Sequence, residues 1–150
     1  MNTRTIPNDI LIPEIKRFID DGHTAIFRVR GNSMRLFLKD GRDKVVLAPC
    51  HKVNVRDVVL AEISPGHYVL HRIIRKDGKQ LVLKGDGNVC GTEQCTTDNI
   101  VGIATGFIRK GRDTIDPVSG YKWRIYSAYG SCSAPCVATS SASAAVWVYK

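Results

Sequence analysis

The sequence contains no long hydrophobic run. Its longest weakly polar segment, residues 137–148, is rich in serine and alanine and is too short to cross a bilayer as a helix. Polar residues follow Met1, so we expect no secretory signal there. These features predict a cytoplasmic protein with no transmembrane segment, and they leave room for peripheral contact with a membrane surface.

Cysteine pairs with metal-ligand spacing are also missing. The 5 cysteines are an odd number and include no Cys-x-x-Cys, and the 4 histidines do not complete a zinc pattern. A secreted disulfide framework would more often have an even count. We therefore expect reduced, structural cysteines and no metal or other cofactor.

Acidic residues are scarce relative to basic ones, and the formal net charge is +8. Residues 28–56 hold eight Lys and Arg against two Asp, a local net charge of +6. Such a stretch meets nucleic acid, an anionic membrane or an acidic partner, or it is simply a solvated face. Only 7% of the residues are aromatic, and few interleave with these charges, so base stacking is not indicated. Nucleic acid is therefore an unlikely partner.

The length of 150 residues fits a single domain spanning residues 1–150. Hydrophobic residues make up 43% and charged residues 24%, which excludes a disordered tail, a collagen and a multi-span membrane protein.

Hydrophobic periodicity predicts one helix followed by strands. Residues 9–21 have helical spacing, with Pro13 placed in the first turn and a stop at residues 20–22. The apolar residues at helical spacing are Ile10, Leu11, Ile15, Phe18 and Ile19. From residue 24 the period becomes two, and strands are expected at 24–30, 44–48, 57–63, 67–75, 80–84 and 100–109.

Turn residues separate these strands. Ser-Pro-Gly at 64–66 and Asp-Gly at the centre of 76–79 predict two hairpins, and Gly102 and Gly106 suggest bulges in the last strand. The fold class is therefore mainly β, with a coiled antiparallel β-sheet and a short N-terminal helix. A basic hinge at 109–112 leads into an extension, residues 110–150, whose aromatic residues at 121–129 we expect to pack on the sheet.

Three short segments stand out together. They are Gly-Asn-Ser-Met at 31–34, the strand Tyr-Val-Leu-His-Arg-Ile-Ile at 68–74, and Lys-Gly-Asp-Gly-Asn at 84–88. With Asp-Val-Val-Leu at 57–60, they resemble the type I signal peptidases and the related SOS-repressor autopeptidases of the LexA type. The resemblance covers about residues 27–107 and implies a signal-peptidase/LexA-like β fold with a peptidase-like core at about 24–109.

The resemblance implies a serine endopeptidase. Ser33 matches the nucleophile, and His71 matches the general base, which is Lys in most bacterial signal peptidases and His in the archaeal and endoplasmic-reticulum type. Asp86 would orient His71 or support the fold locally, and Asp98 is a second candidate for that third role. The chemistry agrees, because a serine hydroxyl needs a base near neutral pH and histidine supplies one.

Relatives bind an extended peptide whose small residues enter shallow pockets beside the site. By that resemblance, the strand at 27–30 is the candidate edge for the peptide, and main-chain pairing would supply affinity. The substrate-binding residues are then Phe27, Val29, Gly31 and Met34. The partner implied is a peptide or protein with small residues near the cleavage site, and the sequence's own Ala-Ser-Ala at 142–144 raises a self-cleavage hypothesis.

The sequence departs from the family in several places. Leu36 stands where proline is usual, and Arg56 stands where glycine is usual. We expect neither a membrane anchor nor, in the residues before the first strand, a helix-turn-helix. These departures keep an alternative open: a catalytically inactive peptide-binding or regulatory module with the same fold.

Overall fold

The computed structural model describes residues 6–29, 34, 41–87, 91–118 and 146–148. It contains these elements: α1 (Asn8–Asp20), β1 (Ala25–Val29), β2 (Lys44–Ala48), β3 (Val58–Ser64), β4 (His67–Asp77), β5 (Gln80–Lys84), β6 (Glu93–Thr96), the short 3-10 helix η1 (Thr97–Asn99), β7 (Ile100–Ile108), β8 (Asp116–Pro117) and β9 (Val146–Val148). The expected mainly β fold with a short N-terminal helix is confirmed.

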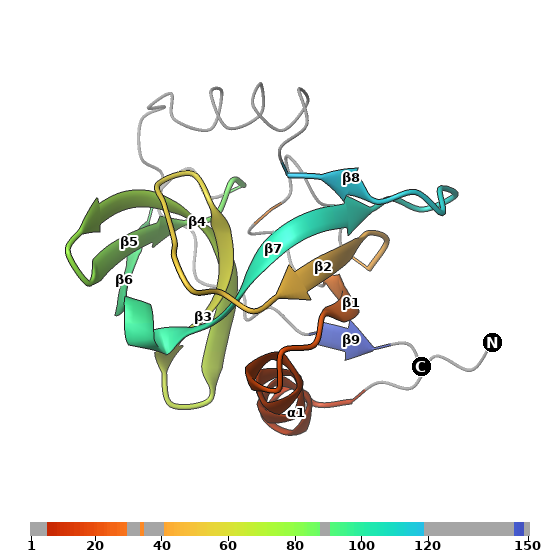
Figure 1. Cartoon of the computed structure of the whole chain (residues 1–150), viewed down its shortest axis with the longest axis horizontal. Coiled ribbons are helices and arrows are strands. Elements are labelled where there is room, and N and C mark those ends of the chain that lie inside the picture. Colours follow the sequence, from red (N-terminus) through yellow and green to blue (C-terminus); the bar gives the residue numbers. More distant parts are fainter. Residues whose placement is uncertain (1–5, 30–33, 35–40, 88–90, 119–145, 149–150) are drawn as a thin grey trace.

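The strands form one antiparallel sheet in the order β6-β5-β4-β3-β7-β2-β1-β9, with β8 beside β7. Figure 1 shows the sheet coiling so that β3 to β6 form one half and β1, β2, β7 and β9 the other. In the part of the chain that is described, no helix is long and apolar enough to span a membrane.

Helix α1 packs one stripe of apolar residues against the sheet. The buried positions are Leu11, Ile12, Ile15 and Ile19. Ile10 and Phe18, which the sequence grouped with this stripe, are 59% and 50% exposed. Pro13 lies inside the helix rather than in its first turn, because α1 begins at Asn8. The helix ends as predicted, at Asp21 and a left-handed Gly22 with φ of 88°.

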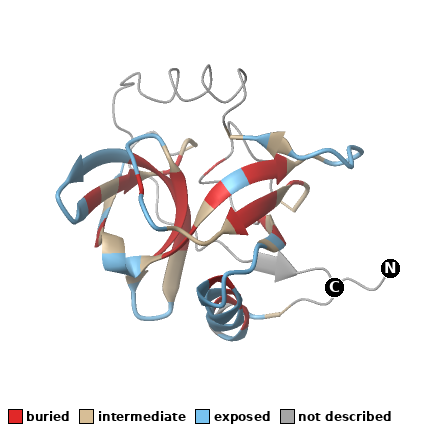
Figure 2. Cartoon of the chain, in the orientation of Figure 1, coloured by how far each residue is buried: buried red, intermediate tan, exposed pale blue. Residues whose placement is uncertain are grey.

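Strands β3 and β4 are buried on both faces, which builds two adjoining cores. In β3, Val58 and Leu60 belong to one cluster, while Val59 and Ala61 belong to the other. This division follows from the alternation of side chains along a strand. Figure 2 shows the buried residues concentrated where the two halves of the sheet meet. The coiled sheet therefore encloses the buried parts of β3 and β4, and β4 carries His71 and Arg72.

Two features of the turns and bulges bear on the sequence predictions. The β4–β5 hairpin pairs Asp77 with Gln80, so the turn residues are Gly78-Lys79 rather than Asp77-Gly78. Register shifts occur in β7 beside Gly102 and Gly106, as expected. A Cβ on Gly102 would lie 2.9 Å from the carbonyl oxygen of Ala48, so this position has no space for a side chain.

Arg56 adopts a backbone conformation that favours glycine, with φ of 81°. Its N–H donates to the carbonyl of Ile73 at 2.7 Å, so β4 holds the residue in this conformation. The position at which the resemblance leads us to expect glycine is thus one where glycine fits with less strain.

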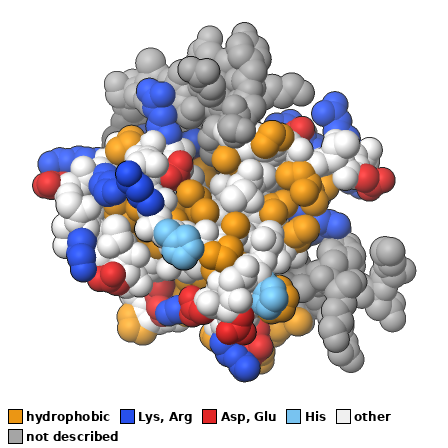
Figure 3. All heavy atoms as spheres, viewed as in Figure 1, with side chains coloured by type: hydrophobic (Ala, Val, Ile, Leu, Met, Phe, Trp, Pro, Cys, Tyr) orange, Lys and Arg blue, Asp and Glu red, His pale blue; other side chains and the backbone are white. Residues whose placement is uncertain are grey.

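The structure does not show the eight basic residues of the 28–56 stretch as one continuous exposed surface. Three of the eight lie outside the described residues, and the Arg42 guanidinium is held by the buried Asp43, with Nε 2.7 Å from Oδ1. Figure 3 shows Lys and Arg side chains around the rim of one face, with apolar side chains toward its middle.

Sequence patterns did not predict β6, β8 or β9. The aromatic residues expected to pack on the sheet, at 121–129, lie outside the described residues.

Candidate active site

Of the residues expected to bind substrate, Phe27 and Val29 are buried in the first core, 1% and 6% exposed. Their side chains pack inward, so an incoming peptide would meet the main chain of β1 rather than these side chains. Ser33 and Gly31 lie outside the described residues. Met34, the neighbour of Ser33, is described and is 1% exposed.

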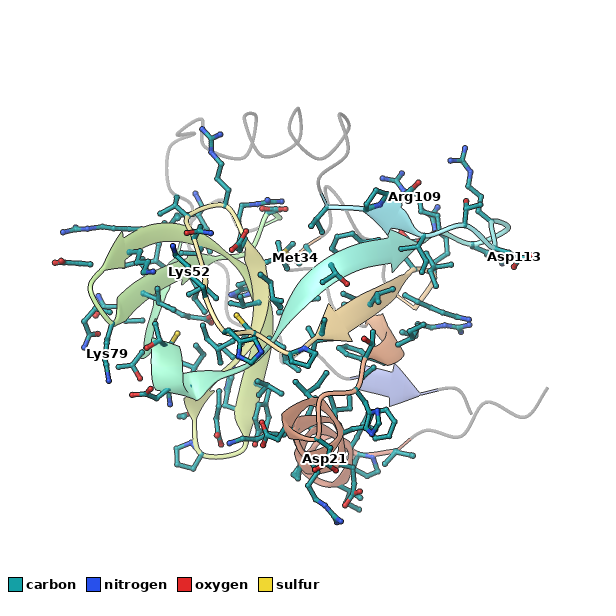
Figure 4. All side chains as sticks on the ribbon, in the orientation of Figure 1. Asp21, Met34, Lys52, Lys79, Arg109 and Asp113 are labelled. Carbon is teal, nitrogen blue, oxygen red and sulfur yellow. The ribbon has the colours of Figure 1, made fainter. Side chains whose placement is uncertain are left out.

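Met34 connects the segment at 31–34 to the segments at 68–74 and 84–88. Figure 4 labels it at the centre of the molecule, and it packs in the core that β3, β4 and β7 share. The backbone N–H of Asp86 points at the Met34 sulfur, with N 3.5 Å from Sδ. The segment at 31–34 is therefore anchored, at its last residue, against the segment at 84–88.

Asp86 forms a buried, two-bond ion pair with Arg72. Arg72 Nε lies 2.7 Å from Oδ1 and Nη2 lies 2.5 Å from Oδ2, and the two side chains are 4% and 7% exposed. Arg72 Nη1 also donates to the carbonyl oxygen of Arg56 at 3.0 Å. Planar two-bond pairing of this kind fixes orientation as well as charge. The three sequence segments thus meet through the contacts of Met34, Asp86 and Arg72.

His71 precedes Arg72 on β4 and so projects from the opposite face of the strand. It is 4% exposed, and its Nδ1 lies 2.7 Å from Oε2 of Glu93 on β6. Both atoms are buried, and their approach falls outside hydrogen-bond geometry, so neither atom has a hydrogen-bond partner among the residues with described positions. A proton that the Glu93 carboxylate keeps on Nδ1 leaves Nε2 as the proton acceptor of the ring.

Burial lowers the pKa of His71 below its ordinary value of 6.5, because the charged imidazolium loses its hydration. The carboxylates of Glu93 and Asp86 act in the opposite direction and favour the charged form, while His67 lowers the pKa further. Burial is the largest of these effects. His71 is therefore a neutral base at neutral pH, and the carboxylate beside it can stabilise the imidazolium when a proton arrives.

The carboxylate that contacts His71 is neither of the two aspartates named in the sequence analysis. Both oxygens of Asp86 are bonded to Arg72, so its contacts are those of local structural support rather than of a partner for His71. Asp98 is 76% exposed and lies 3.8 Å from Lys79. The carboxylate against His71 belongs to Glu93.

Glu93 was missed because its strand was missed. Strand β6 is Glu-Gln-Cys-Thr, with only one apolar side chain, so it carries no strand signal of its own. The available clue was alternation, because Glu93 lies two residues before the buried Cys95. In the described part of the chain, no three His, Cys, Asp or Glu side chains converge as a metal ion would require.

Comparison with known proteins gives one result. A family model described as Peptidase S24-like matches residues 3–105, which span α1 to the middle of β7 and include every site residue named above. No curated protein and no solved structure matches the chain.

Proposed function

The chain belongs to the Peptidase S24-like family, and on that premise we propose that it is a serine endopeptidase. It hydrolyses a peptide bond in a protein or peptide substrate, with Ser33 as nucleophile, His71 as general base and Glu93 as the carboxylate that orients His71. The observation that carries the proposal is the 2.7 Å distance between Glu93 Oε2 and Nδ1 of the buried His71. His71 is the residue before Arg72 on β4, and Arg72 pairs with Asp86.

The proposed reaction has two stages. Ser33 Oγ attacks the carbonyl carbon of the scissile bond while His71 Nε2 accepts the hydroxyl proton. His71 then gives that proton to the departing amine, leaving an acyl ester on Ser33. A water molecule, deprotonated by His71, attacks the ester and releases the acid and the free serine. The backbone N–H of Ser33 is the proposed donor to the developing oxyanion.

The remaining residues of the site hold this arrangement in place. Glu93 keeps the proton on Nδ1, so that Nε2 faces the reaction as an acceptor. Met34 and the Arg72–Asp86 pair anchor the segment that carries Ser33 to β4, the strand that carries His71. The proposed substrate is an extended segment with small residues near the cleavage site, met in the cytoplasm.

A second candidate, a peptide-binding module without catalysis, is favoured by one observation. The outer edge of β1, where relatives bind their substrate, is paired with β9 of the same chain. Because β9 covers this edge, a peptide would bind only when β9 is displaced, and such regulated binding requires no catalysis.

Reaction with a serine-acylating probe, scanned from pH 5 to 9, separates the two candidates. The variants are Ser33→Ala, His71→Ala and Glu93→Gln, and the matched controls are Ser64→Ala and His51→Ala, both at exposed positions. The peptidase proposal expects labelling that requires Ser33 and His71 and is unaffected by the controls. Labelling of Ser33→Ala at the wild-type rate would exclude Ser33 as the nucleophile. An absence of labelling across acyl probes, with β9 displaced by Trp147→Pro, would favour the binding module.

A further inference from the structure

The outer edge of β1 is occupied by the C-terminal strand. β9 pairs with β1 antiparallel, with Phe27 opposite Val148, Arg28 opposite Trp147 and Val29 opposite Val146. The other edge of β1 pairs with β2. Figure 1 shows β9 lying beside β1 and close to α1. β9 therefore supplies the main-chain partners that an edge strand otherwise lacks.

The location of β9 coincides with the edge at which a substrate strand is proposed to bind. Because Val146 lies opposite Val29, the chain enters β9 at the end of β1 that leads on to Ser33. Phe27 and Val29 are buried, so the edge recognises its partner through backbone hydrogen bonds. One edge cannot pair with two strands, so β9 and a bound peptide exclude each other.

The composition of β9 indicates what the edge accepts. Val-Trp-Val carries no charge and combines β-branched with aromatic residues, the types that favour extended structure. With three residues, β9 is shorter than an ordinary strand, so its pairing is limited to a few hydrogen bonds. It holds its place by being part of the same chain, because tethering raises its local concentration.

We propose that β9 is an intramolecular competitor for the β1 edge, where the resemblance to the peptidase family places an extended peptide strand, and that the strand it excludes is uncharged. The identification of that peptide with the substrate rests on the proposed peptidase function. The binding and the competition do not, because backbone pairing needs no catalysis.

The test uses the full chain carrying Ser33→Ala, so that no peptide is cleaved. A fluorescent peptide with the sequence of residues 143–149 and blocked ends, so that it carries no charge, is titrated against this protein with and without Trp147→Pro, and its anisotropy is measured. Proline removes a backbone donor and disrupts the pairing of β9. Ser131→Pro, elsewhere in the C-terminal extension, is the matched control. We expect at least tenfold tighter binding to the Trp147→Pro protein and no change with the control.

Hydrogen exchange of the β1 amides gives a second readout that does not depend on the peptide. Trp147→Pro should speed their exchange, and added peptide should slow it again, while circular dichroism confirms that the sheet is retained. Equal peptide affinity with and without Trp147→Pro, or no binding to either protein, would overturn the competition. If this happens while Ser33-dependent labelling persists, the peptidase proposal stands alone. If the peptide binds more tightly to the Trp147→Pro protein but no Ser33-dependent labelling is found, the competition stands and the peptidase proposal is excluded.

Discussion

Nδ1 of His71 lies 2.7 Å from Oε2 of Glu93, and the two residues come from strands that do not pair with each other. β5 stands between β4 and β6 in the sheet, so the contact exists because the sheet coils. The fold thereby brings a carboxylate to a buried imidazole without placing it nearby in sequence. This relationship is the reason for proposing His71 as the general base.

Glu93→Gln should lower the rate of Ser33 acylation by about 100-fold or more, as expected when a histidine base loses the carboxylate that fixes its tautomer. The amide is close in size to the carboxylate, so the fold should persist. The measurement is the labelling rate at pH 8, with Gln94→Glu, exposed on the same strand, as the control for a change of charge. A Glu93→Gln enzyme that labels within twofold of wild type would remove Glu93 from the proposed site.

The lowered pKa of His71 predicts how activity and stability respond to acid. Because the folded pKa lies below the ordinary value of 6.5, the unfolded chain takes up the proton first as the pH falls. His71 therefore contributes stability above about pH 6.5 that is lost as the pH falls through its folded pKa, and labelling should fall over the same acid range. Melting temperatures of wild type and His71→Gln, measured from pH 4 to 8, check the sign. Parallel curves for the two proteins would contradict it.

Asp86→Asn should destabilise the protein strongly, because it removes the charge of the carboxylate that pairs with the 4% exposed Arg72. Removing one partner of a buried pair typically costs about 3–5 kcal/mol. The free energy of unfolding in urea measures the effect. Asp98→Asn is the matched control, because its contact with Lys79 is exposed and 3.8 Å long, and it should change nothing measurable. Similar losses for the two variants would show that the Arg72–Asp86 pair has no special role.

Strand positions could be predicted from the sequence because alternation records burial. The predictions for β2 and β5 match their bounds, and those for β1, β3, β4 and β7 lie within two residues at each end. Both glycines expected to mark bulges in β7 lie beside its register shifts, since a close neighbouring chain excludes a side chain there.

Pairing between distant segments could not be predicted in the same way. β6 and β9 are short, and each is a strand because it pairs with a strand at one end of the sheet, β6 with β5 and β9 with β1. The side chain that a carboxylate contacts also depends on residues distant in sequence. Asp86 lies 14 residues after Arg72 in the sequence and binds it across the end of a hairpin. The sequence left open whether Asp86 would orient His71 or support the fold locally, and it did not identify Arg72 as the partner. Turn chemistry was misplaced by one residue at Gly78 because the register, not the dipeptide, fixes the centre of the turn.

Arg56 provides a prediction about stability that is independent of catalysis. Its φ of 81° is held from both sides, by its N–H to Ile73 and by the Arg72 guanidinium on its carbonyl oxygen. A left-handed conformation costs an ordinary residue about 1–2 kcal/mol, more for a β-branched one, whereas glycine adopts it freely and loses more entropy on folding. Arg56→Gly should therefore be at least as stable as wild type and about 1–2 kcal/mol more stable than Arg56→Val.

Urea unfolding of the two Arg56 variants measures that difference directly. Val55→Gly, at the exposed neighbouring residue with no positive φ, is the control, and it should lower stability by about 0.5–1 kcal/mol because glycine gains nothing there. Opposite effects of glycine at two adjacent positions would follow from backbone conformation alone, since both side chains are exposed. If Arg56→Gly unfolds at a lower urea concentration than Arg56→Val, the left-handed backbone at Arg56 is not present in solution.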